Sequence, residues 1–261
     1  MRYGGWSTAL KEEKDDMKCL FLAAGFATRL YPLTQNFPKP LLKVGERNIL
    51  DRLVDDLEST RLIDGYCVVS NARFVDHFHE WVKTRPENIA VVNDGTTTNE
   101  TRLGAVRDLA LGIESLKIDD DLLVLAGDNL LDFSLKGFLE YAREKGTSCA
   151  MRYNEPDVEK LKRCGVMQID AQDRVVSMEE KPPKPQSHWC APPFYYYRRE
   201  DLPLVATALK EGCGVDAPGS FLAWLAAHVP VHAYLMPGKR FDVGTLESYN
   251  RIREMFQRRD A

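Results

Sequence analysis

The sequence has no apolar run close to the roughly 20 residues that a helix needs to cross a bilayer. Its opening, Met1 to Gly5, is not followed by the apolar block of a secretory signal. It also lacks the basic excess of proteins that bind nucleic acid or anionic membranes, because the net charge is −4. We therefore expect a cytoplasmic protein that binds neither membranes nor nucleic acid.

Two further patterns are missing. The six cysteines contain no C-x-x-C pair, which favours reduced, packed thiols, and His77 and His79 are followed by no Cys or His cluster that would complete a zinc site. The glycine fingerprint G-x-G-x-x-G is also absent, so a dehydrogenase-type dinucleotide site is not indicated.

What is present fits an α/β enzyme core. Of the 261 residues, 44% are apolar and 28% are charged, which allows a substantial interior and a soluble surface. Residues 1–16 combine Gly4-Gly5 with a run of charged residues, and we expect a disordered or non-catalytic extension there. Residues 17–261 are expected to form a single catalytic domain.

From Met17 onward, strand and helix patterns alternate. Buried strands are expected at residues 18–24, 65–70, 89–92 and 121–126, and helices at 49–59, 75–83 and 102–116. Strands that are apolar throughout and separated by helices predict a parallel sheet covered on both faces, with a ligand at the carboxyl ends of the strands. The second half is less regular, with β-rich stretches at 166–169, 174–178 and 194–198, a proline-rich segment at 182–193 and a closing helix from about Leu246.

The loop after the first strand is the first candidate site. It would present backbone N–H groups to phosphate oxygens, and Arg29 and Lys39 would add fixed positive charge. A tight turn with two surface cations remains the alternative reading of these residues alone. The candidate nucleotide-binding residues are Leu22, Ala23, Ala24, Gly25, Phe26, Ala27, Thr28, Arg29 and Lys39.

Two carboxylate-bearing segments are further candidates. Asp128 ends the strand expected at 121–126, where it could hold a divalent cation through oxygen or cap a helix. Glu180 and Lys181 precede Pro182, and by themselves they are equally typical of a solvated strand end.

Together these segments resemble the sugar-phosphate nucleotidylyltransferases, also called nucleoside-diphosphate-sugar pyrophosphorylases, which include glucose-1-phosphate thymidylyl- and uridylyltransferases. The family pattern is close to L-A-G-G-x-G-T-R-L-x-P-L-T followed by P-K-P-L-L, and it matches residues 28–34 and 38–42. Ala27 departs from it, since the family usually has glycine there. The resemblance runs from Met17 to about Tyr249 and implies an α/β fold of the nucleotide-diphospho-sugar transferase type: a Rossmann-like, mixed, mainly parallel sheet with helices on both faces.

The resemblance also implies a role for each candidate residue. Asp128, and Asp242 in a block that is usually D-T-G-T, would be the ligands of Mg²⁺. Glu180 would bind sugar hydroxyls, Lys181 would bind the sugar phosphate, and Gly165 in a Y-G-V-like block would border the sugar.

The implied reaction condenses a nucleoside triphosphate with a sugar 1-phosphate to give an NDP-sugar and pyrophosphate. Arg29, Lys39 and Lys181 are the expected catalytic cations, since all reactants are anions. A non-catalytic homologue would be expected to have lost Arg29, Lys39, Asp128 or Asp242, and all four are present.

Substrate identity and oligomeric state, a homo-oligomer included, stay open. Residues 93–104 replace the block that usually contacts the base, and Pro193 replaces a glycine near the sugar pocket. The alternative is a cytidylyltransferase acting on a non-sugar phosphate or phosphonate such as choline phosphate, for which Trp189, Tyr195 and Tyr196 could form an aromatic cage.

Overall fold

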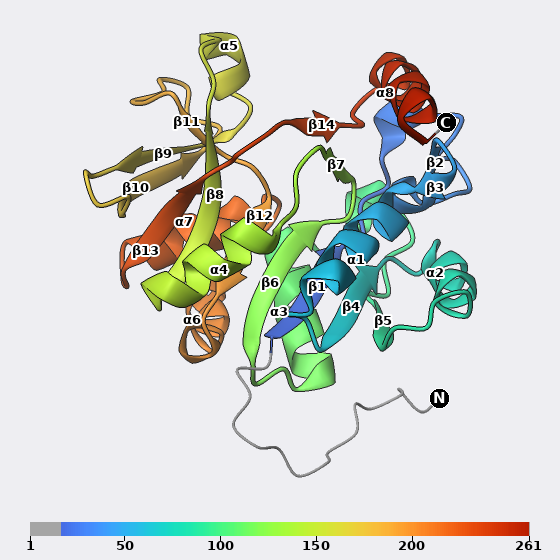
Figure 1. The fold of residues 1–261 in the computed structure, drawn as a ribbon. Coiled ribbons are helices and arrows are strands. Elements are labelled where there is room, and N and C mark those ends of the chain that lie inside the picture. Colours follow the sequence, from blue (N-terminus) through green and yellow to red (C-terminus); the bar gives the residue numbers. More distant parts are fainter. Residues whose placement is uncertain (1–16, 261) are drawn as a thin grey trace.

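A ten-stranded mixed sheet organises the protein in the computed structural model, which describes residues 17–260 (Figure 1). The expected extension, residues 1–16, lies outside the described residues. The strands across the sheet are β10 (Val175–Glu180), β9 (Gly165–Ile169), β11 (Trp189–Ala191), β8 (Ser148–Asn154), β12 (Phe194–Tyr197), β6 (Asp121–Ala126), β1 (Met17–Leu22), β4 (Gly65–Ser70) and β5 (Ile89–Asn93), with β13 (Val231–Leu235) paired to β8.

The half of the sheet formed by the first part of the chain is parallel. β1 lies between β4 and β6, and β5 extends the sheet beyond β4. Every residue of β4 is buried, as an apolar strand covered on both faces should be. The carboxyl ends of these four strands therefore meet at one edge.

The other half is mainly antiparallel. β12 pairs antiparallel with β6 and β8, and β9, β10 and β11 continue that pattern, whereas β13 pairs parallel with β8. The expected mixed sheet is thus confirmed, with its parallel strands gathered around β1.

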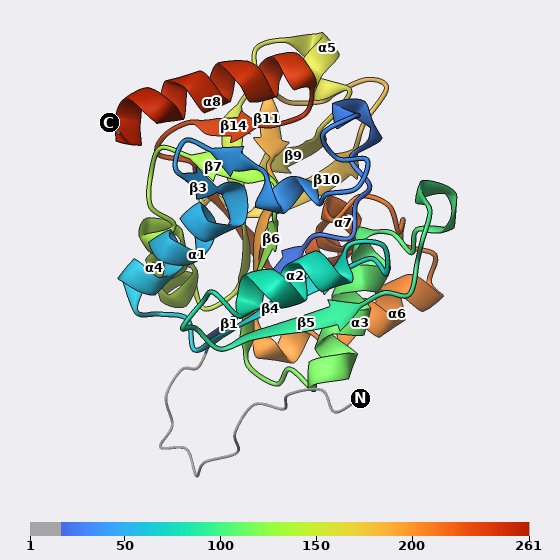
Figure 2. The same cartoon turned by 90° about the vertical axis from the view of Figure 1, so that its right-hand side faces the viewer.

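Helices cover both faces of the sheet, as predicted (Figure 2). Successive strand residues point to opposite faces, so Phe21 packs in a core with α1, α2 and α4, and Leu20 packs in a second core with α3, α6 and α7. The helices are α1 (Ile49–Thr60), α2 (Val75–Val82), α3 (Ala105–Leu116), α4 (Lys136–Lys145), α5 (Val158–Leu161), α6 (Leu204–Lys210), α7 (Gly219–Ala226) and α8 (Leu246–Asp260).

A third core lies beneath α8, the helix drawn in red at the top of Figure 1. Ile252 and Phe256 of α8 pack against Leu30 and Leu42, and the Tyr249 hydroxyl donates to the Lys43 carbonyl at 2.8 Å. The small sheets of this region are β2 (Lys43–Val44) with β3 (Arg47–Asn48), and β7 (Asn129–Leu131) with β14 (Arg240–Asp242). The closing helix therefore packs against both segments of the N-terminal motif, residues 28–34 and 38–42, which we call the phosphate-loop motif.

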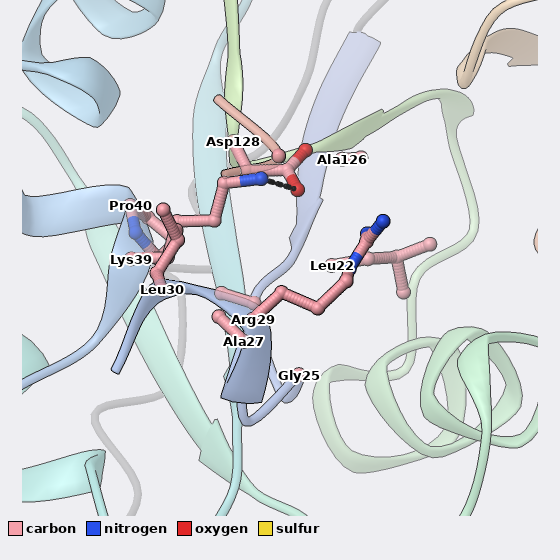
Figure 3. A pocket seen from close by; sticks show the side chains of 11 residues that line it. Leu22, Gly25, Ala27, Arg29, Leu30, Lys39, Pro40, Ala126 and Asp128 are labelled. Carbon is pink, nitrogen blue, oxygen red and sulfur yellow. Dashed lines mark hydrogen bonds and ion pairs between the residues drawn. The ribbon is translucent and has the colours of Figure 1, made fainter. Parts of the chain in front are cut away.

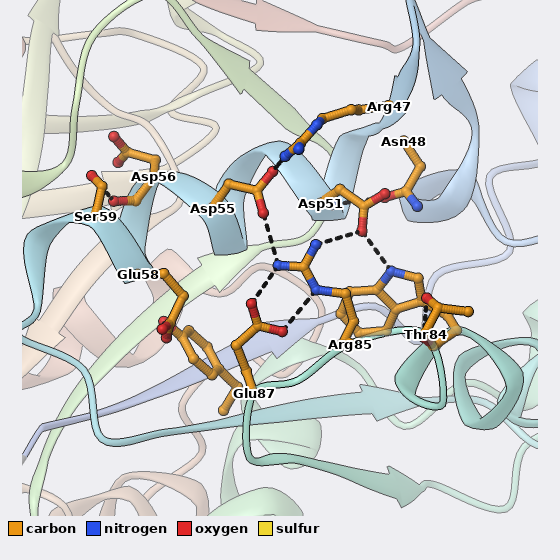
Figure 4. Close-up of polar contacts among 12 residues, drawn as sticks. Arg47, Asn48, Asp51, Asp55, Asp56, Glu58, Ser59, Thr84, Arg85 and Glu87 are labelled. Carbon is orange, nitrogen blue, oxygen red and sulfur yellow. Dashed lines mark hydrogen bonds and ion pairs between the residues drawn. The ribbon is translucent and has the colours of Figure 1, made fainter.

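A cluster of charged side chains joins α1 to the connection between α2 and β5 (Figure 4). Arg85, whose side chain is 11% exposed, contacts Asp51, Asp55 and Glu87 at 3.2, 2.8 and 2.8 Å. The Trp81 indole also donates to Asp51 at 2.8 Å. Since one guanidinium serves three carboxylates, we interpret this cluster as a structural link.

Most expected elements are present. The strands at residues 65–70 and 121–126 have the predicted bounds, and the closing helix begins at Leu246. The helix expected at 102–116 begins at Ala105, because Gly104 takes a φ of 92° and a 3-10 turn occupies Asn99–Thr101. No helix within residues 17–260 is long and apolar enough to cross a membrane.

Candidate active site

A pocket of about 160 Å³ lies at the carboxyl ends of β1 and β6 (Figure 3). Its walls combine the small residues of the phosphate-loop motif with Arg29, Lys39 and Asp128. The lining residues are Leu22, Ala23, Gly25, Ala27, Arg29, Leu30, Lys39, Pro40, Ala126, Asp128 and Gly244.

The loop after β1 keeps backbone donors free. Among the described residues, no acceptor pairs with the N–H groups of Gly25, Phe26 or Thr28. The turn is closed at Ala27, which takes a left-handed φ of 47° and whose carbonyl accepts from the Thr34 hydroxyl at 2.8 Å. Glycine is the residue that usually takes this conformation, and Ala27 adopts it at a modest steric cost.

The side chain of Asn71, which sequence analysis did not identify, holds this loop through a hydrogen bond to its backbone. Its side chain is fully buried, donates to the Ala24 carbonyl at 2.9 Å, and accepts from the Phe74 N–H at 3.0 Å. Ala24 and Phe26 are themselves buried beneath the loop, and together with exposed Thr28 they do not line the pocket. Only their backbones are placed to serve a ligand.

Lys39 joins the two predicted metal ligands. Its ammonium lies 2.7 Å from Asp128 Oδ2 and 3.6 Å from Asp242 Oδ1. The end of β6 presents Asp128 and the edge strand β14 presents Asp242, so residues more than 100 positions apart converge on one cation. The structure thus brings Lys39, Asp128 and Asp242 together at one place.

A second cation, Arg240, acts on the same carboxylate and was missed from sequence. Arg240 donates to Asn129 Oδ1 at 2.7 Å, and Asn129 donates to Asp128 Oδ1 at 2.9 Å. Burial alone would raise the pKa of Asp128, but the charge and hydrogen bond of Lys39, with the charge of Arg240, hold that pKa below its ordinary value. The only feature of the sequence that could have identified Arg240 is its position two residues before Asp242.

The carboxylates of Asp128 and Asp242 fit a divalent cation, since both reach one positive charge. Within residues 17–260 no group of three or more His, Cys, Asp or Glu side chains could hold a metal by itself. Two carboxylates completed by phosphate oxygens and water are nevertheless the set that Mg²⁺ uses with nucleotides.

The predicted acceptor residues form a second group on β9 and β10. A Cβ added at Gly165 would lie 3.0 Å from Glu180 Oε1, and one added at Gly219, the first residue of α7, would lie 1.9 Å from it. Burial raises the pKa of Glu180, the Lys181 charge opposes this, and Cys164 adds to the rise. Two glycines therefore make room for a carboxylate among apolar neighbours, and Gly219 was not identified from sequence.

Lys181 follows β10 and has an unusual backbone. Its φ is 51°, its N–H donates to the Cys164 carbonyl at 2.9 Å, and its side chain is exposed. Gly165, Glu180 and Lys181 do not line the pocket at β1 and β6. The charge of Arg240 lowers the pKa of both Asp128 and Cys164, the residue that precedes Gly165.

The aromatic residues considered for a choline pocket do not form one. Tyr195 and Tyr196 are buried in opposite cores, and the Arg152 guanidinium lies 4.2 Å from the centre of the Trp189 ring. That alternative therefore loses its structural basis. The six cysteines are all free, four of them buried, which fits the prediction of packed thiols.

Comparison with known proteins identifies the family. The family model described as "Nucleotidyl transferase" matches residues 18–258, nearly the whole chain. The chain belongs to this family. A Sulfolobus acidocaldarius protein described as "Putative mannose-1-phosphate guanyltransferase" is 27% identical over 239 residues; the match covers 90% of this chain but only 62% of that relative's length.

Solved structures agree on the fold. A UDP-glucose pyrophosphorylase complexed with UDP-glucose superposes with a TM-score of 0.79 at 17% identity, covering 93% of this chain and 99% of that one. A UTP-bound enzyme of the same description from Acinetobacter baumannii gives a TM-score of 0.74 at 18% identity, covering 92% and 93%. At these identities the likeness supports the fold, which is that of nucleotide-diphospho-sugar transferases.

Proposed function

We propose that this protein is a nucleotidylyltransferase that condenses a nucleoside triphosphate with a sugar 1-phosphate, releasing pyrophosphate. The observation that carries the proposal is the pocket that brings Gly25, Arg29 and Lys39 together with Asp128, while Asp242 Oδ1 lies 3.6 Å from the Lys39 ammonium. Residues 17–261 act as one catalytic unit in this proposal.

The phosphate groups of the nucleotide bind at the loop after β1. The N–H groups of Gly25, Phe26 and Thr28 donate to phosphate oxygens, and Arg29 stabilises charge on the α-phosphate and the departing pyrophosphate. Lys39, which pairs with Asp128 in this structure, supplies positive charge to the triphosphate. Asp128 and Asp242 would hold Mg²⁺, which would supply further neutralisation of phosphate charge.

Lys181 and Glu180 orient the acceptor. A phosphate oxygen of the sugar 1-phosphate forms a bond to the α-phosphorus, the α–β bridging bond breaks, and the electron pair leaves with pyrophosphate. A phosphate monoester is a competent nucleophile, so no general base is required. Lys181 binds the attacking phosphate, and the carboxylate of Glu180 accepts from sugar hydroxyls.

A sugar is favoured over choline as the acceptor. Glu180 is half-buried beside Gly165 and Gly219, and a carboxylate held there gains most from the hydroxyl donors of a sugar. The aromatic residues that a choline pocket would need are committed to the cores or to Arg152.

A pyrophosphate-release screen tests the proposal. Four nucleoside triphosphates are each combined with a panel of sugar 1-phosphates and with choline phosphate. We expect release with at least one sugar 1-phosphate, and none when the acceptor is omitted. Release only with choline phosphate, or with no pair at all, would overturn the proposal.

A further inference from the structure

Asp108 is a buried carboxylate that the roles above do not use. It lies in the first turn of α3 and is 6% exposed, yet its Oδ1 has no hydrogen-bond partner among the described residues. A buried polar atom without a partner is costly, so such atoms mark places where a ligand or water completes the structure. Asp108 is therefore the strongest unexplained polar group outside the pocket.

A second carboxylate, Asp94, acts on Asp108 from the end of β5. Asp94 is held by the N–H and hydroxyl of Thr96 at 2.7 and 2.8 Å. Burial, and then the negative charge of Asp94, raise the pKa of Asp108 to about 7. The negative charge of Asp94 therefore acts on the carboxylate of Asp108.

The packing of α3 shows where Asp108 lies. Gly112, one helical turn further along, is so close to the sheet that a Cβ there would lie 2.5 Å from Leu20 Cδ1 of β1 and 3.1 Å from Val69 Cγ2 of β4. Asp108 lies on about the same helix face, about 6 Å nearer the start of α3. Because α3 begins at the carboxyl end of the sheet, this places Asp108 near the loops that follow β1 and β4.

This position suits the far end of a bound nucleotide. The phosphate pocket lies between β1 and β6, and β5 is two strands away from β1, about 10 Å at the usual strand spacing. On the other side of β1 and β6, the sheet continues to β9 and β10, which carry the Glu180–Lys181 group assigned to the acceptor. A base that extends from the phosphates toward Asp108 would therefore lie on the side of β4 and β5.

We propose that Asp108, with Asp94, reads the base of the nucleotide and that this base is guanine, an inference that rests on the proposed function. Guanine presents two adjacent donors on one edge, N1–H and the N2 amino group, which match the two acceptor oxygens of a carboxylate. Uracil and thymine present one N–H between two carbonyl oxygens, and those oxygens repel a carboxylate. Cytosine and adenine place a ring acceptor next to their amino group.

The test compares kcat/KM for GTP, inosine triphosphate and UTP in wild-type protein and in Asp108→Asn. Inosine triphosphate lacks only the N2 amino group. We expect wild-type protein to prefer GTP over inosine triphosphate by about 10-fold or more, since one charged hydrogen bond is removed. In Asp108→Asn, kcat/KM for GTP should fall about 10- to 100-fold, whereas the values for the other two change much less.

Two controls keep the outcomes separate. Asp119→Asn makes the same change at an exposed aspartate beyond the other end of α3 and should leave the preference intact. Circular dichroism and melting temperature check that Asp108→Asn is folded.

Preference for UTP in the wild-type protein, or an equal loss with every nucleotide in Asp108→Asn, would overturn the guanine assignment and indicate that Asp108 binds only water or Asp94. In either case pyrophosphate release would still support the proposed function. Failure of that function would instead appear as no release with any nucleotide.

Discussion

Replacing Lys39 by methionine should destabilise the metal-free protein by about 2 kcal/mol. Methionine keeps most of the buried stem and removes only the charge that lies between Asp128 and Asp242. Breaking a buried ion pair typically costs about 3–5 kcal/mol. Since the side chain of Asp128 is 35% exposed, solvent screens part of this, and we discount the cost to about half.

The assay is urea unfolding at pH 7.5 in EDTA, as a double-mutant cycle with Asp128→Asn. Asp128→Asn removes the charge that Lys39 neutralises, so the Lys39→Met change should cost much less in that background, with a coupling energy of about 1.5 kcal/mol. Lys39→Arg, which keeps the charge, is the matched control.

The dependence on pH has a defined sign. Lys39 contributes to holding the pKa of Asp128 below its ordinary value. The stabilisation that the Lys39–Asp128 pair gives the folded protein is therefore fully present at pH values above the ordinary pKa of an aspartate, and it is lost as the pH falls through the pKa of Asp128 in the folded protein. The cost of Lys39→Met should therefore shrink in acid. A coupling energy below about 0.3 kcal/mol at pH 7.5 would refute the reasoning.

Three further predictions concern single side chains. Asp108→Asn should stabilise the free protein above pH 7, by up to about 4 kcal/mol, because folding raises the pKa of Asp108 from 3.8 to about 7 and ionisation of this carboxyl then opposes folding. Urea unfolding at pH 4 and pH 8 checks that the gain in stability appears only at the higher pH. Arg85→Ala should cost about 3 kcal/mol, since three carboxylates lose one shared partner, whereas Arg199→Ala, at an exposed pair, should cost far less. Equal losses in thermal unfolding would contradict the structural role of Arg85. Gly219→Ala should raise the KM for the sugar 1-phosphate and leave the KM for the nucleotide unchanged, because the added Cβ would lie 1.9 Å from Glu180 Oε1. A change confined to the nucleotide KM would contradict the assignment of Glu180 to the acceptor site.

Local patterns predicted the parallel half of the fold well. Strands such as β4 and β6 are short apolar runs bounded by turns, and burial on both faces leaves them only one reading. The second half was harder, because α7 is apolar on nearly all sides and β8 carries mixed residues, so neither shows a clear period. Their identity depends on partners far away in the chain.

The site divides in a similar way. Arg29, Lys39 and Asp128, which were predicted from motifs that resemble the family's, all line the pocket, because short motifs are local properties of the sequence. Asn71 and Gly219 were missed, because their roles exist only once a distant loop or carboxylate packs against them. The aromatic cage was misjudged for the converse reason: Tyr195 and Tyr196 are adjacent in sequence, and for that reason they point to opposite faces of the sheet.

The most direct test of the proposed chemistry is the single-turnover rate of pyrophosphate release in Mg²⁺ for wild-type protein and Asp128→Asn. The two proteins differ by one charge at the point where Lys39 and Asp242 converge. We predict that Asp128→Asn stays folded and loses at least about 100-fold in rate, since charge neutralisation between the two phosphates depends on that carboxylate. A rate within about threefold of wild type would contradict the assignment of this pocket as the catalytic centre.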